Sequence, residues 1–222
     1  MNRMTVPCVL LGLVASFGLA AEEPWVSLFD GKSLDGWTTA AGKGVTAGWQ
    51  AEDGVLHRAA KGGDIYTAKE YGDFELQFEW KISPKGNSGV KYRVTKFGNG
   101  LLGMEYQVLD DGGHADGKKP GGKNSAASMY DIIPPNAGKK LKPVGEWNTA
   151  RIVAKGTKIE HWLNDEKVVD VDTASESFQQ ALAKSKFART KGFSQQTGGR
   201  IMIQDHGNEA WFRNIKIREL KQ

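Results

Sequence analysis

Apolar and polar residues alternate with a period of two along most of the chain, in short runs separated by Gly, Asn and Asp. The clearest run, residues 73–82, places four apolar side chains on one face: Phe74, Leu76, Phe78 and Trp80. Such alternation is typical of a β-strand with one buried and one exposed face. We expect further strands within residues 48–59, 88–95, 103–110, 125–133, 147–156, 157–171, 199–207 and 210–220.

Two of these runs contain hairpin signals. Asp53-Gly54 interrupts residues 48–59, and Asn164-Asp165 interrupts residues 157–171. Both dipeptides favour the tight turns that join antiparallel strands.

One segment, residues 174–188, has helical rather than strand periodicity. Ser175 or Ser177 could cap its N-terminus, and Phe178 and Leu182 follow at helical spacing. About ten strands with one short helix predict an all-β fold, an antiparallel β-sandwich or concanavalin-like jelly roll. No internal repeat or interdomain linker is present, so we expect one domain over residues 22–222.

The N-terminus reads as a secretory signal over residues 1–21. Arg3 precedes an apolar run at 6–19, and Gly18 and Ala20 have the small-residue spacing of a signal-peptidase site. The alternative is a transmembrane anchor, which requires ~20 apolar residues. We therefore expect export to the periplasm or beyond, with no membrane insertion after the signal is removed.

The net charge bears on the possible partners, and the cysteine content bears on disulfide bonds. The net charge is +4 and the lysines are scattered, which argues against a nucleic-acid partner. Cys8 is the only cysteine and lies within the signal, so the mature chain has no disulfide. Neither feature determines the oligomeric state.

The sequence GMEYQVLDD, residues 103–111, departs from a simple half-buried strand. Glu105 and Gln107 share one face, and Asp110 joins them only if a bulge re-aims it. This polar row could lie on the floor of a sugar-binding sheet. The alternative is the solvent-facing side of an antiparallel strand.

The spacing Glu-x-Gln-x-x-Asp is similar to the Glu-x-Asp-x-x-Glu row of laminarinase-type retaining glycosidases. Those enzymes need two carboxyl groups about 5–5.5 Å apart. Gln107 cannot titrate and Asp110 is shorter than Glu, which argues against an ordinary retaining glycosidase.

Two further segments carry candidate chemistry. Asn87 lies at a predicted turn before a strand that carries Arg93, which could polarise a carbonyl oxygen or be a surface charge. Asp205 and His206 end a later strand, where they could form an acid–base corner or be structural. The long loop at 110–125, rich in Gly and Lys, is either functional or mobile.

Six segments in order resemble the bacterial 3-keto-disaccharide hydrolase domain family and together cover nearly all of the mature chain: LFDGKSLDGW, GWQAEDGVL, YGDFELQFEWKISPKGNSGVKYRV, GMEYQVLDD, GEWNTARIVAKGTKIEHWLNDEKVVD and IMIQDHGNEAWFRNIKIREL. The resemblance implies a concanavalin-like jelly roll, export, and action on glycosides already oxidised at C3. The chain departs from the family at Lys91, where an apolar or aromatic residue is frequent, and in the long segment 175–199.

A ketone at C3 acidifies the C2 hydrogen, so a single base could start a β-elimination at C1 without a paired nucleophile. We expect Glu105 or His206 as the base and Arg93 as the carbonyl polariser. Substrate-binding residues are expected at four further positions: Gln107, Asp110, Asn87 and Asp205.

The sequence establishes no cofactor. A divalent cation could replace Arg93, with oxygen ligands from Glu105, Asp110 and Asp205. The competing function is a non-catalytic carbohydrate-binding domain on the same scaffold.

Overall fold

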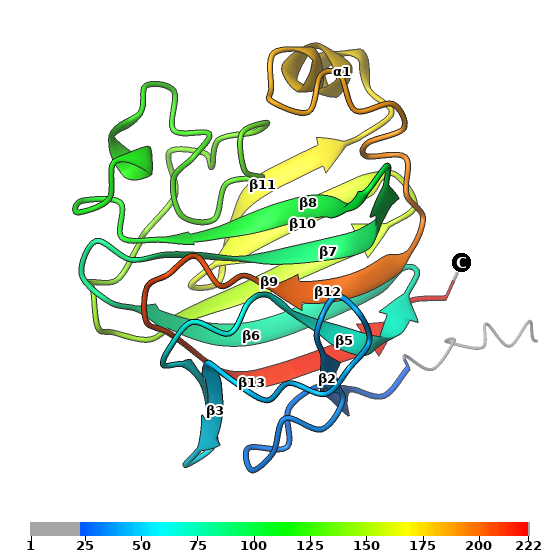
Figure 1. Cartoon of the computed structure of the whole chain (residues 1–222). Coiled ribbons are helices and arrows are strands. Elements are labelled where there is room, and N and C mark those ends of the chain that lie inside the picture. The colour runs from blue at the N-terminus through cyan, green and yellow to red at the C-terminus, as the bar shows by residue number, and fades with distance from the viewer. Residues whose placement is uncertain (1–22, 222) are drawn as a thin grey trace, which may run out of the picture.

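Two antiparallel sheets form the protein, packed face to face in the computed structural model (Figure 1). The structure describes residues 23–221, so the signal-peptide prediction for residues 1–21 lies outside the described residues. The predicted all-β antiparallel sandwich is confirmed, with more strands than expected.

The larger sheet has eight strands in the order β11-β10-β9-β6-β13-β4-β3, with β1 paired to β13. Its strands are β1 (Val26–Ser27), β3 (Trp49–Glu52), β4 (Val55–Arg58), β6 (Phe74–Ile82), β9 (Asn148–Lys155), β10 (Lys158–Leu163), β11 (Glu166–Asp172) and β13 (Ala210–Glu219).

The smaller sheet has five strands in the order β2-β5-β12-β7-β8. They are β2 (Trp37–Thr38), β5 (Ile65–Tyr71), β7 (Asn87–Phe97), β8 (Gly100–Leu109) and β12 (Gly199–Ile203). β8 stands at one end of this order and pairs with β7 along its length, so β8 is an edge strand of the smaller sheet.

The core lies between the two sheets and is built by the predicted alternation. In β6, all four expected apolar side chains are buried, and the Phe78 ring meets the Tyr106 ring of β8 edge-on at 5.6 Å between centroids. His161 is also fully buried, between the Tyr92 hydroxyl at 2.8 Å and the Ala127 carbonyl oxygen at 3.1 Å. Burial lowers the pKa of His161 to about 4, so the core holds a neutral imidazole.

Both hairpin predictions are confirmed. Asp53 and Gly54 have φ of 49° and 78° between β3 and β4, and Asn164 and Asp165 have φ of 48° and 67° between β10 and β11. These left-handed conformations are those that the tight two-residue hairpin turn requires.

The predicted helix is α1 (Glu176–Ala183), shorter than the pattern suggested. Ser175 is its N-cap and accepts a hydrogen bond from the Phe178 backbone N–H at 3.3 Å. Phe178 is buried, so the apolar side of the helix faces the protein.

The prediction of a strand at residues 125–133 is wrong. This segment is a series of turns with isolated bridges, and it runs along the free edge of β8. It blocks the open edge of the smaller sheet, because the Gln107 carbonyl oxygen accepts from the Ala127 N–H at 2.8 Å.

The preceding loop contains the 3₁₀ helix η1 (Asp116–Lys118). In Figure 1 this loop and α1 lie on the same side of the molecule as β8. Within the described residues, no helix has the length and apolar character needed to cross a bilayer.

Candidate functional site

The register between β7 and β8 determines which side chains share the outer face of the smaller sheet. Lys91 pairs with Glu105 and Gly89 pairs with Gln107. Because side chains alternate across a strand, these positions face away from the core, opposite to Tyr106 and its inward neighbours. The strand pairing therefore places the predicted Glu105–Gln107 row next to Lys91.

Glu105 is nearly covered, with 4 % of its surface exposed. The missing side chain of Gly89 makes room for its carboxylate, since a Cβ atom there would lie 2.3 Å from Glu105 Oε1. A glycine opposite Gln107 is therefore a steric requirement of this carboxylate position.

Three charged side chains act on the Glu105 carboxylate. Burial raises the pKa of Glu105, and the negative charge of Asp64 adds to this. The ammonium groups of Lys91 and Lys186 oppose the rise, and Lys91 Nζ lies 3.7 Å from Glu105 Oε2. A desolvated carboxylate beside ammonium groups has the character of a general base.

Two segments from elsewhere in the chain lie near Glu105. Tyr130 lies over β8, where its backbone N–H donates to the Glu105 carbonyl oxygen at 3.0 Å. Its hydroxyl donates to Asp116 at 3.1 Å, and Lys186 Nζ lies 4.3 Å from its ring centroid. Burial and the Asp116 charge raise the pKa of Tyr130 to about 12, so the phenol remains protonated at neutral pH.

Gln107 and Asn87 carry buried amide oxygens to which no group in the described part of the chain donates. The Gln107 amide nitrogen donates to the Asn124 carbonyl oxygen at 3.4 Å, which leaves Oε1 unpaired. Buried polar atoms normally have a partner. Both oxygens are therefore available to accept hydrogen bonds from a bound hydroxyl.

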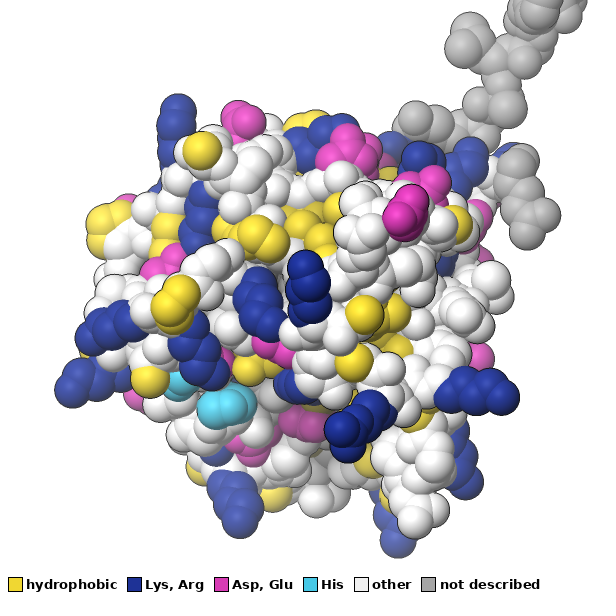
Figure 2. All heavy atoms as spheres, turned by 90° about the horizontal axis from the view of Figure 1, so that it is seen from above, with side chains coloured by type: hydrophobic (Ala, Val, Ile, Leu, Met, Phe, Trp, Pro, Cys, Tyr) yellow, Lys and Arg dark blue, Asp and Glu magenta, His cyan; other side chains and the backbone are white. Residues whose placement is uncertain are grey.

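His206 is exposed at the end of β12 and faces a second histidine. The ring centroids of His206 and His114 are 6.1 Å apart, edge to face. The positive form of His206 also favours the ionised form of Asp64, whose pKa is raised by burial. Figure 2 shows histidine side chains at the surface, near acidic side chains and among lysines and arginines, on the face seen from above.

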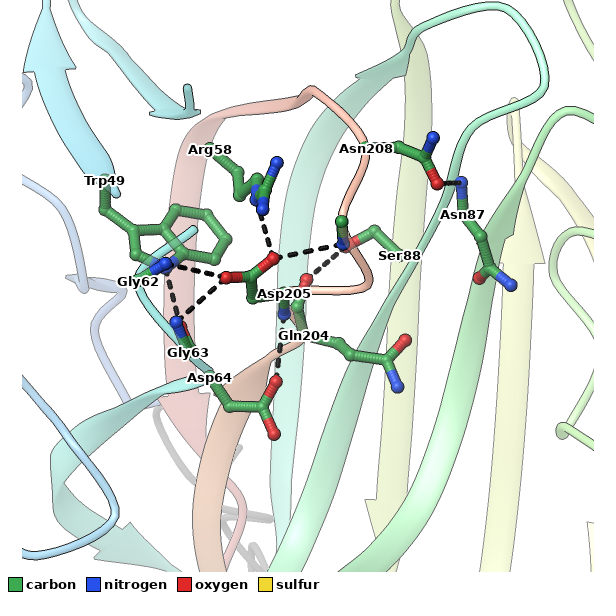
Figure 3. A network of polar contacts seen from close by, with 11 residues as sticks. Trp49, Arg58, Gly62, Gly63, Asp64, Asn87, Ser88, Gln204, Asp205 and Asn208 are labelled. Atoms are coloured by element: carbon green, nitrogen blue, oxygen red, sulfur yellow. Dashed lines mark hydrogen bonds and ion pairs between the residues drawn. The ribbon is translucent and has the colours of Figure 1, made fainter. Parts of the chain in front are cut away.

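Asp205 is fully engaged by the protein. Its carboxylate accepts from Arg58 Nε at 2.6 Å and from the backbone N–H groups of Gly62 and Gly63, each at 2.8 Å (Figure 3). Burial tends to raise the pKa of Asp205, but these hydrogen bonds hold it below the ordinary value. In Figure 3 the side chains of Gln204 and Asn87 extend away from this carboxylate.

Asp110 has a similar local role. One carboxylate oxygen accepts from the Lys85 N–H at 2.7 Å, and the other accepts from the Gly113 N–H at 2.9 Å. The bulge that would have turned Asp110 toward Glu105 is not present at this residue, and β7 and β8 change register between Tyr92 and Thr95 instead. Asp110 thus joins the β6–β7 turn to the start of the long loop.

Arg93 lies at that register change, with φ of 50°. Its guanidinium donates to Asp73 at 2.9 Å and to the Gly156 and Gln196 carbonyl oxygens at 2.7 and 3.3 Å. The strands of Arg93 and Glu105 are neighbours. The polar partners of Arg93, however, all lie outside the Glu105 cluster, which consists of Glu105, Lys91, Asp64, Tyr130 and Lys186. Lys91, not Arg93, is therefore the basic residue beside Glu105.

No group of three or more His, Cys, Asp or Glu side chains converges on a common point among residues 23–221. The suggested ligand set of Glu105, Asp110 and Asp205 is therefore not assembled.

Four residues of the Glu105 cluster were missed as site residues: Lys91, Asp64, Tyr130 and Lys186. The sequence singled out Lys91 only as a position where the chain departs from the family that it resembles. The other three come from segments 41 residues before Glu105 and 25 and 81 residues after it, so no local spacing connects them.

Comparison with known proteins identifies relatives across almost the whole described region. The profile of the 3-keto-α-glucoside-1,2-lyase-like domain matches residues 24–218. A protein of Bacteroides thetaiotaomicron named 3-keto-disaccharide hydrolase is 37 % identical over an alignment of 229 positions, gaps included, which covers 88 % of this chain and 78 % of that protein.

Two solved structures from Parabacteroides distasonis have the same architecture, and both are described as candidate glycosyl hydrolases. One has a TM-score of 0.79 at 32 % identity and covers 89 % of this chain and 94 % of its own. The other has a TM-score of 0.72 at 29 % identity and covers 89 % and 100 %.

Proposed function

Because the chain belongs to the 3-keto-α-glucoside-1,2-lyase-like domain family, we propose that it cleaves 3-keto-glycosides by β-elimination with Glu105 as general base. The family and the named relative support a glycoside hydrolase-like function. The observation that carries the finer proposal is the Glu105–Lys91 pair, a desolvated carboxylate 3.7 Å from an ammonium group.

In the proposed reaction, Glu105 removes the proton at C2 of the oxidised sugar. The product of this step is an enolate whose negative charge lies on the C3 oxygen, and Lys91 stabilises that charge as it develops. Lys186, the second ammonium group near Glu105, adds to that stabilisation.

The enolate then expels the oxygen substituent at C1, which leaves a C1=C2 double bond conjugated with the C3 ketone. The departing oxygen takes a proton from His206, an exposed imidazole at the rim of the cluster. Water adds to C1, a proton returns to C2, and the product is the free 3-keto sugar. Gln107 and Asn87 would accept hydrogen bonds from sugar hydroxyl groups through their unpaired oxygens.

The substrate pair that tests this proposal is a 3-keto-glucoside and the matching unoxidised glucoside. Elimination requires the ketone, so aglycone should be released from the first alone. Turnover of both at similar rates would exclude the mechanism. Sugar binding without release from either would favour the carbohydrate-binding alternative.

A second measurement follows the C2 hydrogen. In D₂O, elimination and rehydration should introduce deuterium at C2 of the product at the rate of cleavage. A reaction without enzyme corrects for spontaneous exchange beside the ketone. Cleavage without deuterium at C2 would indicate direct hydrolysis.

Export through residues 1–21 remains part of the proposal, and N-terminal sequencing of the secreted protein would test it.

A further inference from the structure

A cavity of about 820 Å³ lies on the opposite side of the molecule from Glu105, on the outer face of the larger sheet. Its floor consists of β6, β9 and β13, and the core between the sheets separates it from the outer face of β8. The size is in the range of ligand pockets in proteins. None of the residues assigned to the reaction lines it.

The floor is polar and already ordered by hydrogen bonds. Glu79 accepts from the Asn214 amide at 2.6 Å and from Arg213 at 2.7 and 2.8 Å. The hydrogen-bonding side chains that line the cavity alternate with core residues on the three strands: Gln77, Glu79, Thr149, Arg151, Asn214 and Lys216. A preordered floor lowers the entropy cost of binding a ligand.

A bulge in β13 shapes this floor. The pairing of β13 with β6 shifts between Arg213 and Lys216, and Asn214 has φ of 52°. Bulges bend a strand and re-aim its side chains, and they are frequent beside functional sites. Here the bulge directs the Asn214 amide to Glu79 within the cavity lining.

Two half-buried tryptophans line the cavity, Trp25 from the N-terminal segment and Trp162 from β10. Arg151 stacks on Trp162 with 3.7 Å between the guanidinium carbon and the ring centroid. The Trp162 indole N–H donates to Glu160 at 2.7 Å, which fixes the orientation of the ring. The cavity therefore combines rigid aromatic surfaces with a hydrogen-bonding floor.

The charges of the lining balance. Glu79 and Asp165 contribute two negative charges, and Arg151 and Lys216 contribute two positive charges. A polyanion such as a nucleic acid would need an excess of positive charge. Indole surfaces beside amide and charged hydrogen-bonding groups instead suit a neutral ligand with apolar C–H faces and many hydroxyl groups.

We propose that this cavity is a second carbohydrate site, which binds a neutral oligosaccharide without cleaving it. The exposed parts of the Trp25 and Trp162 indoles contact the sugar rings, and the side chains of Thr149 and Arg151 bind hydroxyl groups. The site is independent of Glu105 and does not rest on the proposed reaction. It would hold a glycan chain while the opposite face acts on an oxidised sugar unit.

The test is calorimetric titration of the purified full chain with maltohexaose, with cellohexaose and, as the polyanionic probe, with a heparin hexasaccharide. At least one neutral hexasaccharide should bind with a Kd on the order of 0.1–1 mM. The variant Trp162→Ala should weaken this binding by about tenfold or more. Trp211→Ala is the matched control, because Trp211 lies on the same sheet, stacks on His57 and does not line the cavity.

A second variant keeps the test valid if Trp162→Ala does not fold. Thr149 is exposed at the cavity, and its backbone rather than its side chain bonds Asn164. Thr149→Trp should therefore fill the cavity, retain the strand pairing and abolish hexasaccharide binding.

Binding that survives Thr149→Trp, or that Glu105→Gln abolishes, would overturn the proposal. Binding of heparin alone, or of none of the three probes, would also overturn it. Because the Glu105 variant should bind normally here and fail to cleave, loss of one site is distinguishable from loss of the other.

Discussion

Lys91 and Arg93 stand two residues apart on β7, but their surroundings differ. Arg93 is 1 % exposed and donates to Asp73 and to two backbone carbonyl oxygens. Lys91 is partly exposed, and its nearest carboxylate oxygen lies 3.7 Å away on Glu105. Arg93 joins three separate segments of the chain, whereas Lys91 retains hydrogen-bonding capacity.

This difference shows how to distinguish a structural charge from a reactive one. A buried charge that binds several separate segments stabilises the fold, and its removal leaves its partners unpaired. A partly exposed charge beside a single carboxylate can interact with a substrate. The same contrast separates Asp205, which has donors on both carboxylate oxygens, from Glu105.

The largest expected effect is on turnover in Glu105→Gln. Loss of a general base should lower kcat for a 3-keto-glucoside by about 10²- to 10⁴-fold. The steady-state release of aglycone measures this, with Glu146→Gln as a control at an exposed loop position. A rate near that of the wild type would exclude Glu105 as the base.

The same variant should not lose stability at neutral pH. The raised pKa of Glu105 means that the folded state binds this proton more tightly than the unfolded chain. The charged carboxylate therefore destabilises the fold as pH rises through its folded pKa. Melting temperatures of the wild type should fall relative to Glu105→Gln above that pH, and the opposite trend would contradict the burial of Glu105.

The next largest effect is on stability in Arg93→Met. The free energy of unfolding should fall by about 3 kcal/mol, because Asp73 and two carbonyl oxygens lose their donor. Denaturant titration measures this, with Lys91→Met as the matched control. Protein that remains folded should keep kcat/KM within about threefold of the wild type. A larger loss of kcat/KM would show that Arg93 takes part in the reaction after all.

Lys91→Met should reverse this profile, with a loss of about tenfold in kcat/KM and little change in stability. Because Lys91 favours the ionised form of Glu105, its removal should raise the pKa of Glu105 further. The acidic limb of the pH profile should then move to higher pH. Lys91→Arg keeps the charge and should leave that limb in place.

The smallest effect is expected in Gln107→Met. A sugar hydroxyl would lose one hydrogen bond, worth about 0.5–1.5 kcal/mol, so KM should rise by a few fold while kcat changes little. Stability should change little, because removal of the unpaired buried Oε1 atom offsets loss of the long hydrogen bond to the Asn124 carbonyl oxygen. A marked fall in the melting temperature would show that Gln107 has a structural role instead.

Local pattern was sufficient for most of the strands and for both predicted hairpin turns, but it missed β1, β2 and β5. The alternation in β6, the hairpin dipeptides at Asp53 and Asn164, and the cap at Ser175 depend on neighbouring residues only. The segment at 125–133 was misassigned, because its apolar residues pack against β8 through turns and not through a strand of their own. The apolar pattern of a short run indicates that its residues are buried, but it does not distinguish a paired strand from a series of buried turns.

The sequence by itself determined an all-β sandwich with Glu105 and Gln107 on one strand face, since side-chain direction alternates with residue number. Only the tertiary structure decided which charges meet there. The register of β7 against β8 selected Lys91 over Arg93 as the partner of Glu105. Chain folding brought Asp64 and Lys186 to the same carboxylate from distant segments. Charge interactions depend on distance in space, which spacing along the chain does not encode.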